Sequence, residues 1–213
     1  MEDKLYSVYE YLDKEGNFDY ESYKSAQVKA NKRKINKVWV QEDNVKFLAD
    51  YLKKRNSNIA FGICHGTRRG LEQKWFKKYL GCEVIGTEIS DTATDFPDTI
   101  QWDFHDVKKE WVGSTDFIYS NSLDHSYDPR LCLQQWMKCL NNKGLCILEY
   151  SPGADERINS VDSFGTKLPA LPYLILEWGS GKFFAIDLIK APAKIKYSKA
   201  SSYSSWFLVI KNA

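Results

Sequence analysis

The segment NIAFGICHGTRRGLEQKWFKKYLGCEVIGTE, residues 58–88, decides the fold of this chain. It begins with a short apolar run, which predicts a buried strand, and continues with a turn that contains Gly66 and Gly70. Apolar residues then recur at helical spacing over 71–80, and a second apolar strand ends at Glu88. Strand, glycine turn, helix and strand in this order predict a doubly wound α/β sheet.

This arrangement predicts a ligand site at one edge of the sheet. Ligands of open α/β sheets bind beyond the carboxyl ends of the strands, where the turn and Glu88 are expected to meet. A glycine turn lets a ligand approach the backbone closely, and a carboxylate about 20 residues further on accepts hydrogen bonds from ribose hydroxyls. The segment therefore predicts a site for a nucleoside cofactor.

Strands and helices continue to alternate after Glu88, which predicts a mostly parallel sheet. Asp128 and Pro129 suit the N-cap and the first position of a helix. The other expected elements are strands at 99–104, 116–120, 145–149, 183–189 and 205–211, and a helix at 170–178. Residues 151–169, punctuated by Pro152 and Gly153, read as a loop able to cover the sheet edge.

Residues 1–40 are expected to form a helical extension before the α/β domain, residues 41–213, which starts with a helix at 41–54. A run of basic residues without an acid marks the helix predicted at 20–37. Its members are Lys24, Lys29, Lys32, Arg33, Lys34 and Lys37. Such a run is typical of a solvated helix face, and it also suits a phosphate-bearing substrate or partner.

Size and composition indicate a globular chain with one α/β core. The chain has 213 residues, of which 43% are hydrophobic and 27% charged, and its net charge of +2 is too small to indicate nucleic acid binding. No apolar stretch approaches the roughly 20 residues that span a bilayer, and no signal peptide is evident at the N-terminus. Five cysteines without CxxC spacing suggest neither a disulfide framework nor a zinc knuckle, so we expect a cytoplasmic protein.

Polar residues follow each of the first four predicted strands of the sheet. They are His65 after the first, Glu88 after the second, Asp103 and His105 after the third, and residues 121–125 after the fourth. The set includes all three histidines of the chain. Because they lack a ligand spacing such as HxxxH, we expect separate polar contacts and no metal site.

This ordered series resembles the S-adenosylmethionine-dependent methyltransferases of the Rossmann-like class, over about residues 58–150. Residues 61–68 are similar to the glycine-rich first loop of that family, and residues 84–88 to its second strand. Residues 116–129 resemble its fourth-strand segment, and residues 136–149 the helix, turn and strand that follow. The resemblance implies a mostly parallel seven-stranded sheet with an antiparallel last strand.

The resemblance also implies S-adenosylmethionine as the cofactor. Glu88 would hold the cofactor ribose, and Asp103 the adenine amine, with Asp106 as the alternative if the third strand ends later. The residues implied in cofactor binding are Gly62, His65, Gly66, Thr67, Arg68, Glu88, Ile89, Asp103, Phe104, Asn121, Ser122 and Leu123.

The loop departs from the family pattern at three positions. Gly62 stands where an acid is usual, and Cys64 and Arg68 stand where glycines are common. The methionine amine therefore needs another partner, either His65 or a backbone carbonyl. Arg68 and Arg69 either cap a carboxylate, such as the methionine end of the cofactor, or face solvent.

The chemistry implied by this resemblance is in-line displacement at the methyl group of a sulfonium. A general base is needed only if the acceptor carries a proton, and His125 or Asp124 would serve. The alternative role for His125 is a structural hydrogen bond that shapes its loop.

We expect the acceptor to be a small molecule, a sugar or a lipid-linked glycan. The chain lacks an Asn-Pro-Pro-Tyr or Asp-Pro-Pro-Tyr run for base amino groups and a Pro-Cys nucleophile for cytosine. RNA and protein acceptors stay open, as does a non-catalytic subunit that binds a partner. A nicotinamide-dependent oxidoreductase is a further alternative, although the glycines do not follow GxGxxG and the pair Tyr20 and Lys24 precedes the core. The oligomeric state is not predicted.

Overall fold

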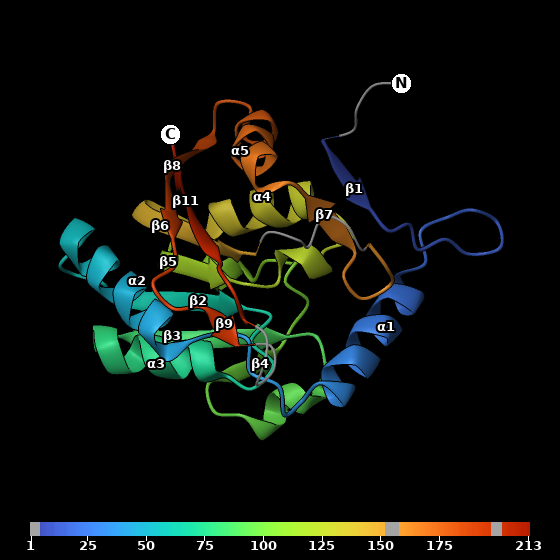
Figure 1. Ribbon diagram of the computed structural model, residues 1–213, viewed down its shortest axis with the longest axis horizontal. Helices are drawn as coiled ribbons and strands as arrows, with labels where there is room; N and C mark the ends of the chain where they lie inside the picture. The colour runs from blue at the N-terminus through green and yellow to red at the C-terminus, as the bar shows by residue number, and fades with distance from the viewer. Residues whose placement is uncertain (1–4, 152–157, 197–201) are drawn as a thin grey trace.

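A seven-stranded sheet forms the centre of the protein in the computed structural model, which describes residues 5–151, 158–196 and 202–213 (Figure 1). In spatial order its strands are β4 (Thr99–Gln101), β3 (Glu83–Glu88), β2 (Phe61–His65), β5 (Thr115–Ser120), β6 (Leu140–Tyr150), β11 (Trp206–Asn212) and β8 (Phe183–Lys190). The last strand, β11, pairs antiparallel with both β6 and β8, and the pairs from β4 to β6 are parallel. The predicted Rossmann-like sheet with an antiparallel last strand is confirmed.

Helices cover both faces of this sheet (Figure 1). One face carries α2 (Glu42–Arg55) and α3 (Leu71–Leu80), and the other α4 (Pro129–Cys139) and α5 (Leu171–Gly179). Each central strand is buried on both sides, because successive side chains of a strand point to opposite faces. In β5, for example, Phe117 and Tyr119 pack with the α2 and α3 layer while Ile118 packs with the α4 and α5 layer.

Local sequence explains where α3 and α4 begin and end. Gly70 and Gly81 flank α3 in the left-handed conformation that glycine adopts without strain. The Asp128 carboxylate accepts a hydrogen bond of 2.9 Å from the Leu131 N–H, so it caps α4 as predicted, and Pro129 takes the first turn.

The N-terminal residues pack against distant parts of the chain. The short strand β1 (Tyr6–Val8) pairs with β7 (Phe164–Thr166), and α1 (Tyr20–Arg33) lies to one side of the sheet (Figure 1). A second small pair joins β9 (Ile195–Lys196) to β10 (Ser202–Tyr203). The segment predicted as an extension is therefore tied to the core by its own strand.

Several predicted boundaries are wrong, each for a local reason. The first helix ends at Arg33 and not at 37, because residues 34–36 form a turn in which the Lys37 N–H donates to the Lys34 carbonyl at 2.8 Å. The strand predicted at 99–104 ends at Gln101, because the Asp103 side chain accepts the His105 N–H and turns the backbone.

Two further predictions missed strand residues. The strand predicted at 145–149 begins at Leu140, so it includes the residues before 145 where the resemblance implied a turn. The predicted loop at 151–169 contains β7, while Pro152 and Gly153 lie outside the described residues. Over the ranges that the structure describes, no helix is long and apolar enough to cross a membrane.

Close packing at Gly62 gives a first prediction. A Cβ added at Gly62 would lie 2.2 Å from two atoms of the Phe117 ring. Gly62→Ala should therefore destabilise the protein by about 1–3 kcal/mol, measured by urea unfolding. Phe117→Leu makes room for the methyl group, so the double variant should lose less than the sum of the two single variants. Additive losses would contradict this account of the packing.

Candidate functional site

A recess opens at the carboxyl ends of β2, β3 and β5, with α1 forming one wall. It encloses about 520 Å³ of space between atoms, open solvent at its mouth included. Its lining residues are Tyr23, Gln27, Ala30, Asn31, Lys34, Gly66, Arg68, Glu88, Ile89, Asp103, Phe104, Ser122, His125 and Val161. The recess therefore lies where a doubly wound sheet binds its ligands.

The turn after β2 forms the floor of this recess. The N–H groups of Gly66 and Thr67 both donate to the Thr87 carbonyl, at 2.9 and 3.1 Å. Gly66 has a φ of +72°, and a Cβ there would lie 2.5 Å from the Cβ of Ser122. Only glycine fits, so this residue lets the turn close onto the ends of β3 and β5 at once.

Glu88 ends β3 with its carboxylate in the recess, and the side chain is almost fully buried. One oxygen accepts the Arg68 N–H and the other the Ser90 N–H, each at 3.1 Å. Burial raises the pKa of Glu88, and these two hydrogen bonds lower it in part. Each carboxylate oxygen accepts more than one hydrogen bond, so Glu88 is held in place and can still bind two hydroxyls.

Asp103 lies next to Glu88 along the recess and is held by three donors. Its Oδ1 accepts the His105 N–H at 3.0 Å and lies 2.7 Å from His105 Nδ1, and its Oδ2 accepts the Tyr20 hydroxyl at 2.9 Å. Burial raises the pKa of Asp103, but these hydrogen bonds more than offset it, so the pKa is lowered. A ligand amine would have to share Oδ2 with Tyr20.

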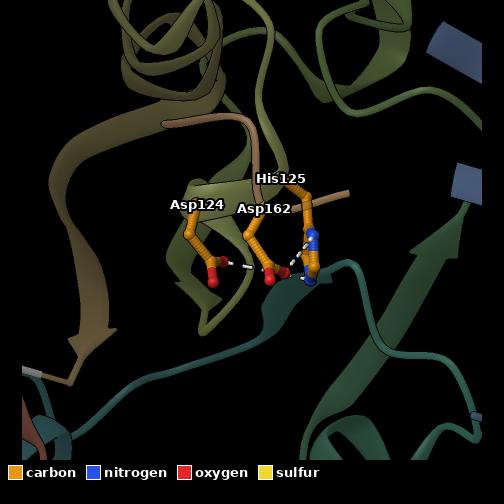
Figure 2. A group of neighbouring side chains, drawn as sticks. All are labelled: Asp124, His125 and Asp162. Carbon is orange, nitrogen blue, oxygen red and sulfur yellow. Dashed lines mark ion pairs between the residues drawn. The ribbon is translucent and has the colours of Figure 1, made fainter. Parts of the chain in front are cut away.

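His125 lines the recess, and the carboxylates of Asp124 and Asp162 lie near its ring, with Asp162 drawn between Asp124 and His125 (Figure 2). Its Nδ1 lies 2.7 Å from the Val161 carbonyl, so this nitrogen donates and Nε2 is left as the acceptor. Asp124 Oδ1 is 4.0 Å from Nε2, and Asp162 Oδ1 is 3.7 Å from Nδ1. Burial and Asp162 raise the pKa of Asp124, and His125 lowers it.

The group of Asp124, His125 and Asp162 is suited to accept a proton from a bound molecule. One ligand atom from each residue falls within 4.8 Å of the others, so the group could also hold a divalent cation.

The structure brings eight of the predicted site residues into the recess. They are Gly66, Arg68, Glu88, Ile89, Asp103, Phe104, Ser122 and His125. Thr67, Asn121 and Asp124 adjoin these residues in the chain but are not part of the lining. Asp106, the alternative to Asp103, is exposed and outside it.

Three predicted site residues lie behind the recess. Gly62 is inside β2 and Leu123 is in the core. The His65 ring stacks on Trp136 at 4.7 Å, and burial lowers its pKa to about 3, which keeps it neutral. The side chain of His65 is thus directed away from the lining.

Sequence reasoning missed the wall that α1 contributes. Tyr23, Gln27 and Ala30 line the recess from one face of α1, and Lys34 at its C-cap continues the same spacing. The spacing was a detectable signal, but the face is half polar and does not stand out as an apolar stripe. Val161 was also missed, because it comes from the segment predicted as an irregular loop.

The fold of this chain is similar to the folds of several solved structures. No protein-family model matches the chain. No curated protein matches it either. Among solved structures, it is similar to the Burkholderia thailandensis 1,6-didemethyltoxoflavin-N1-methyltransferase, solved with 1,6-didemethyltoxoflavin and S-adenosylhomocysteine, at a TM-score of 0.69 and 12% identity. That match covers 97% of this chain and 99% of the other.

The chain has the Rossmann-like methyltransferase fold. The plantazolicin methyltransferase BpumL, solved with a triazolic substrate analogue and S-adenosylhomocysteine, matches at a TM-score of 0.64 and 12% identity over 91% of this chain and 98% of its own. The mitomycin 7-O-methyltransferase MmcR matches at 0.59 and 12%, over 81% of this chain and 54% of its own. The recess described above lies at the ligand-binding edge of this methyltransferase fold.

A buried carboxyl group behind the recess gives a prediction about pH. Glu72, in the first turn of α3, is buried, and one of its oxygens has no hydrogen-bond partner. Burial raises the pKa of Glu72 from 4.5 to about 8, so the folded protein binds this proton more tightly than the unfolded chain does. The stability that Glu72 contributes is therefore complete below about pH 4.5 and is lost as the pH rises toward 8.

Glu72→Gln removes this titration. From pH 5 to 8, the free energy of unfolding of the wild type should fall relative to that of the variant, by up to about 1.4 kcal/mol per pH unit. Urea unfolding of both proteins across this range measures the difference. Parallel pH curves would show that Glu72 titrates normally.

Proposed function

We propose that this protein is an S-adenosylmethionine-dependent methyltransferase whose acceptor is a small molecule. The observation that carries the proposal is the buried Glu88 carboxylate, fixed beside the Gly66 turn and open to the recess. Two hydroxyls on adjacent carbons of a ribose match the two oxygens of such a carboxylate. Similarity to structures solved with S-adenosylhomocysteine supports this cofactor over other nucleosides.

In this proposal the cofactor lies along the recess from Asp103 to His125. The adenine would contact Ile89 and Phe104, with its amine on Asp103, and the ribose would bind Glu88. The methionine portion would pass over the turn and the end of β5, a region made by Gly66, Thr67, Arg68, Asn121 and Ser122. Gly62, His65 and Leu123 would support these residues from behind.

The reaction is an in-line displacement. The cofactor supplies a methyl group on a positively charged sulfur, so the protein has only to align a nucleophile with it and exclude water. For an acceptor that carries a proton, His125 Nε2 is the proposed base. The Val161 carbonyl accepts the hydrogen bond from Nδ1, which leaves Nε2 free to take a proton, and His125 lines the recess. Asp124 is the alternative base. The acceptor keeps the methyl group, and the base takes the proton that the acceptor loses.

The recess favours a small or slender acceptor, such as a small molecule, a sugar or the end of a glycan, because α1 and Val161 wall it. The named substrates of the similar structures are natural products. RNA is less favoured, because Lys32 is paired with Asp91 at 2.8 Å and Lys34 lines the recess. Affinity for RNA that falls steeply with salt would revive that alternative.

All five cysteines are free, which supports a reducing, cytoplasmic location.

Removing the Glu88 carboxylate tests this proposal. Wild-type protein should bind S-adenosylhomocysteine in calorimetry and should show no heat with NAD or NADH. Glu88→Ala should weaken the affinity by about 10- to 100-fold, because the ribose loses its charged partner, worth roughly 1–3 kcal/mol. Asp106→Asn is the matched control, since this exposed carboxylate lies near the same sheet edge but outside the recess.

The control should bind as the wild type does. Melting temperatures of both variants show whether they fold. A folded Glu88→Ala protein with unchanged affinity would refute the ribose contact, and a wild type that binds NAD alone would favour an oxidoreductase.

A further inference from the structure

Lys34 is a basic residue of the recess to which the proposed cofactor site gives no role. Six basic residues occur in the segment 24–37, and Lys34 is the one among them that lines the recess. It continues the helical spacing of Gln27 and Ala30 on the inner face of α1, whereas Lys29 is exposed on the opposite face. A solvated helix face therefore accounts for Lys29 but not for Lys34.

The ammonium group of Lys34 lacks a partner although the residue is half-buried. Its backbone is fixed at the end of α1, because its N–H donates to the Ala30 and Asn31 carbonyls at 3.0 Å each. In the part of the chain that the structure describes, the ammonium has neither a hydrogen bond nor a carboxylate within 4.0 Å. Lys32, two residues earlier, has the Asp91 carboxylate at 2.8 Å. A partly desolvated cation without a partner fits an anionic group of a ligand.

The charge of Lys34 acts at the end of the recess where the acceptor is expected. Burial raises the pKa of Asp124, and His125 and Lys34 both lower it in part. Lys34 therefore lies close to the two residues proposed to take a proton from the acceptor. Glu88 and Asp103, which also line the recess, are the residues proposed for the ribose and the adenine. An anion beside Lys34 is thus expected to belong to the acceptor.

We infer that the methyl acceptor carries an anionic group, a carboxylate or a phosphate, and that Lys34 binds this group. The inference rests on the proposed function, because it takes Glu88 to be occupied by the cofactor ribose. The anionic group positions the acceptor and takes no part in the bond changes, which are those of the proposed function. Arg33 and Lys37, both exposed, add to the positive potential that an approaching anion meets.

Small probes with and without a charge test this inference by NMR titration of the protein saturated with S-adenosylhomocysteine. Benzoate and phenyl phosphate carry the anionic group, and benzamide and dimethyl phenyl phosphate are their neutral counterparts. A flat ring suits the recess, because Tyr23 and Val161 line it. The wild-type complex should bind at least one anionic probe about 10-fold or more tightly than its neutral counterpart. The tighter of the two anionic probes identifies the kind of anion.

Three variants assign the preference to Lys34. Lys34→Met should remove the preference for the anionic probe and leave the affinity for S-adenosylhomocysteine unchanged, because the ribose and adenine contacts are elsewhere in the recess. Lys34→Arg keeps a cation at this point and should keep the preference. Lys29→Met is the matched control, since it removes one charge from the opposite face of the same helix, and it should bind every probe as the wild type does. Melting temperatures show whether each variant folds.

A wild-type complex that binds charged and neutral probes equally, or binds neither, would overturn the inference, as would a Lys34→Met protein that keeps the preference. RNA binding that weakens equally in Lys34→Met and Lys29→Met would overturn it too, because the basic segment would then serve a nucleic acid. A wild type without affinity for S-adenosylhomocysteine would refute the proposed function itself. If the wild type binds S-adenosylhomocysteine and only the contrast between the probes fails, the proposed function stands.

Discussion

The two hydrogen bonds from Gly66 and Thr67 to the Thr87 carbonyl are the constraint on which the site depends. They pull the turn after β2 onto the end of β3, and this is sterically possible only because Gly66 has no side chain to meet Ser122. The closed turn directs the Arg68 N–H at one oxygen of Glu88, and the Ser90 N–H holds the other, so the carboxylate is fixed. A buried acid thus becomes a preorganised acceptor at the open edge of the sheet.

The second feature of the site is the wall formed by α1, a helix that polar contacts hold in place. The helix α1 is held by hydrogen bonds from Tyr20 to Asp103, from Gln27 to the Val161 carbonyl and from Thr92 to Asn31. Tyr23 adds a large buried ring, packed edge-on against Tyr127 and His105. Asp103 lines the recess and also accepts the hydroxyl of Tyr20, the first residue of α1. A ligand that binds Asp103 therefore has to displace this hydroxyl or share the carboxylate with it, and either outcome affects how α1 is held.

The sequence was sufficient to predict the sheet and a carboxylate, Glu88, at the carboxyl end of β3. The alternation of buried strands with amphipathic helices is a strong pattern, and Glu88 stands out because a lone acid ends an apolar strand. The place of α1 was not predictable in the same way. A helix that packs on polar strand ends buries polar residues such as Gln27 and Asn31 beside its apolar ones, so its inner face shows no continuous apolar stripe.

The pairing of the short strands β1 and β7 could not be predicted from the sequence either. The strands β1 and β7 have three residues each and come from opposite ends of the chain, so neither shows enough alternation to be recognised alone. His65 was predicted to contact the ligand, but its side chain does not line the recess. A histidine at a strand end suggested a ligand contact, but the neighbouring Trp136 offers its ring a buried stacking surface, and this packing determines where the side chain points.

A crystal structure of the protein grown with saturating S-adenosylhomocysteine tests the central claim most directly. The account predicts that the ligand occupies the recess, with both ribose hydroxyls within hydrogen-bonding distance of the Glu88 carboxylate. A ligand bound elsewhere, or one in the recess with its ribose away from Glu88, would contradict it.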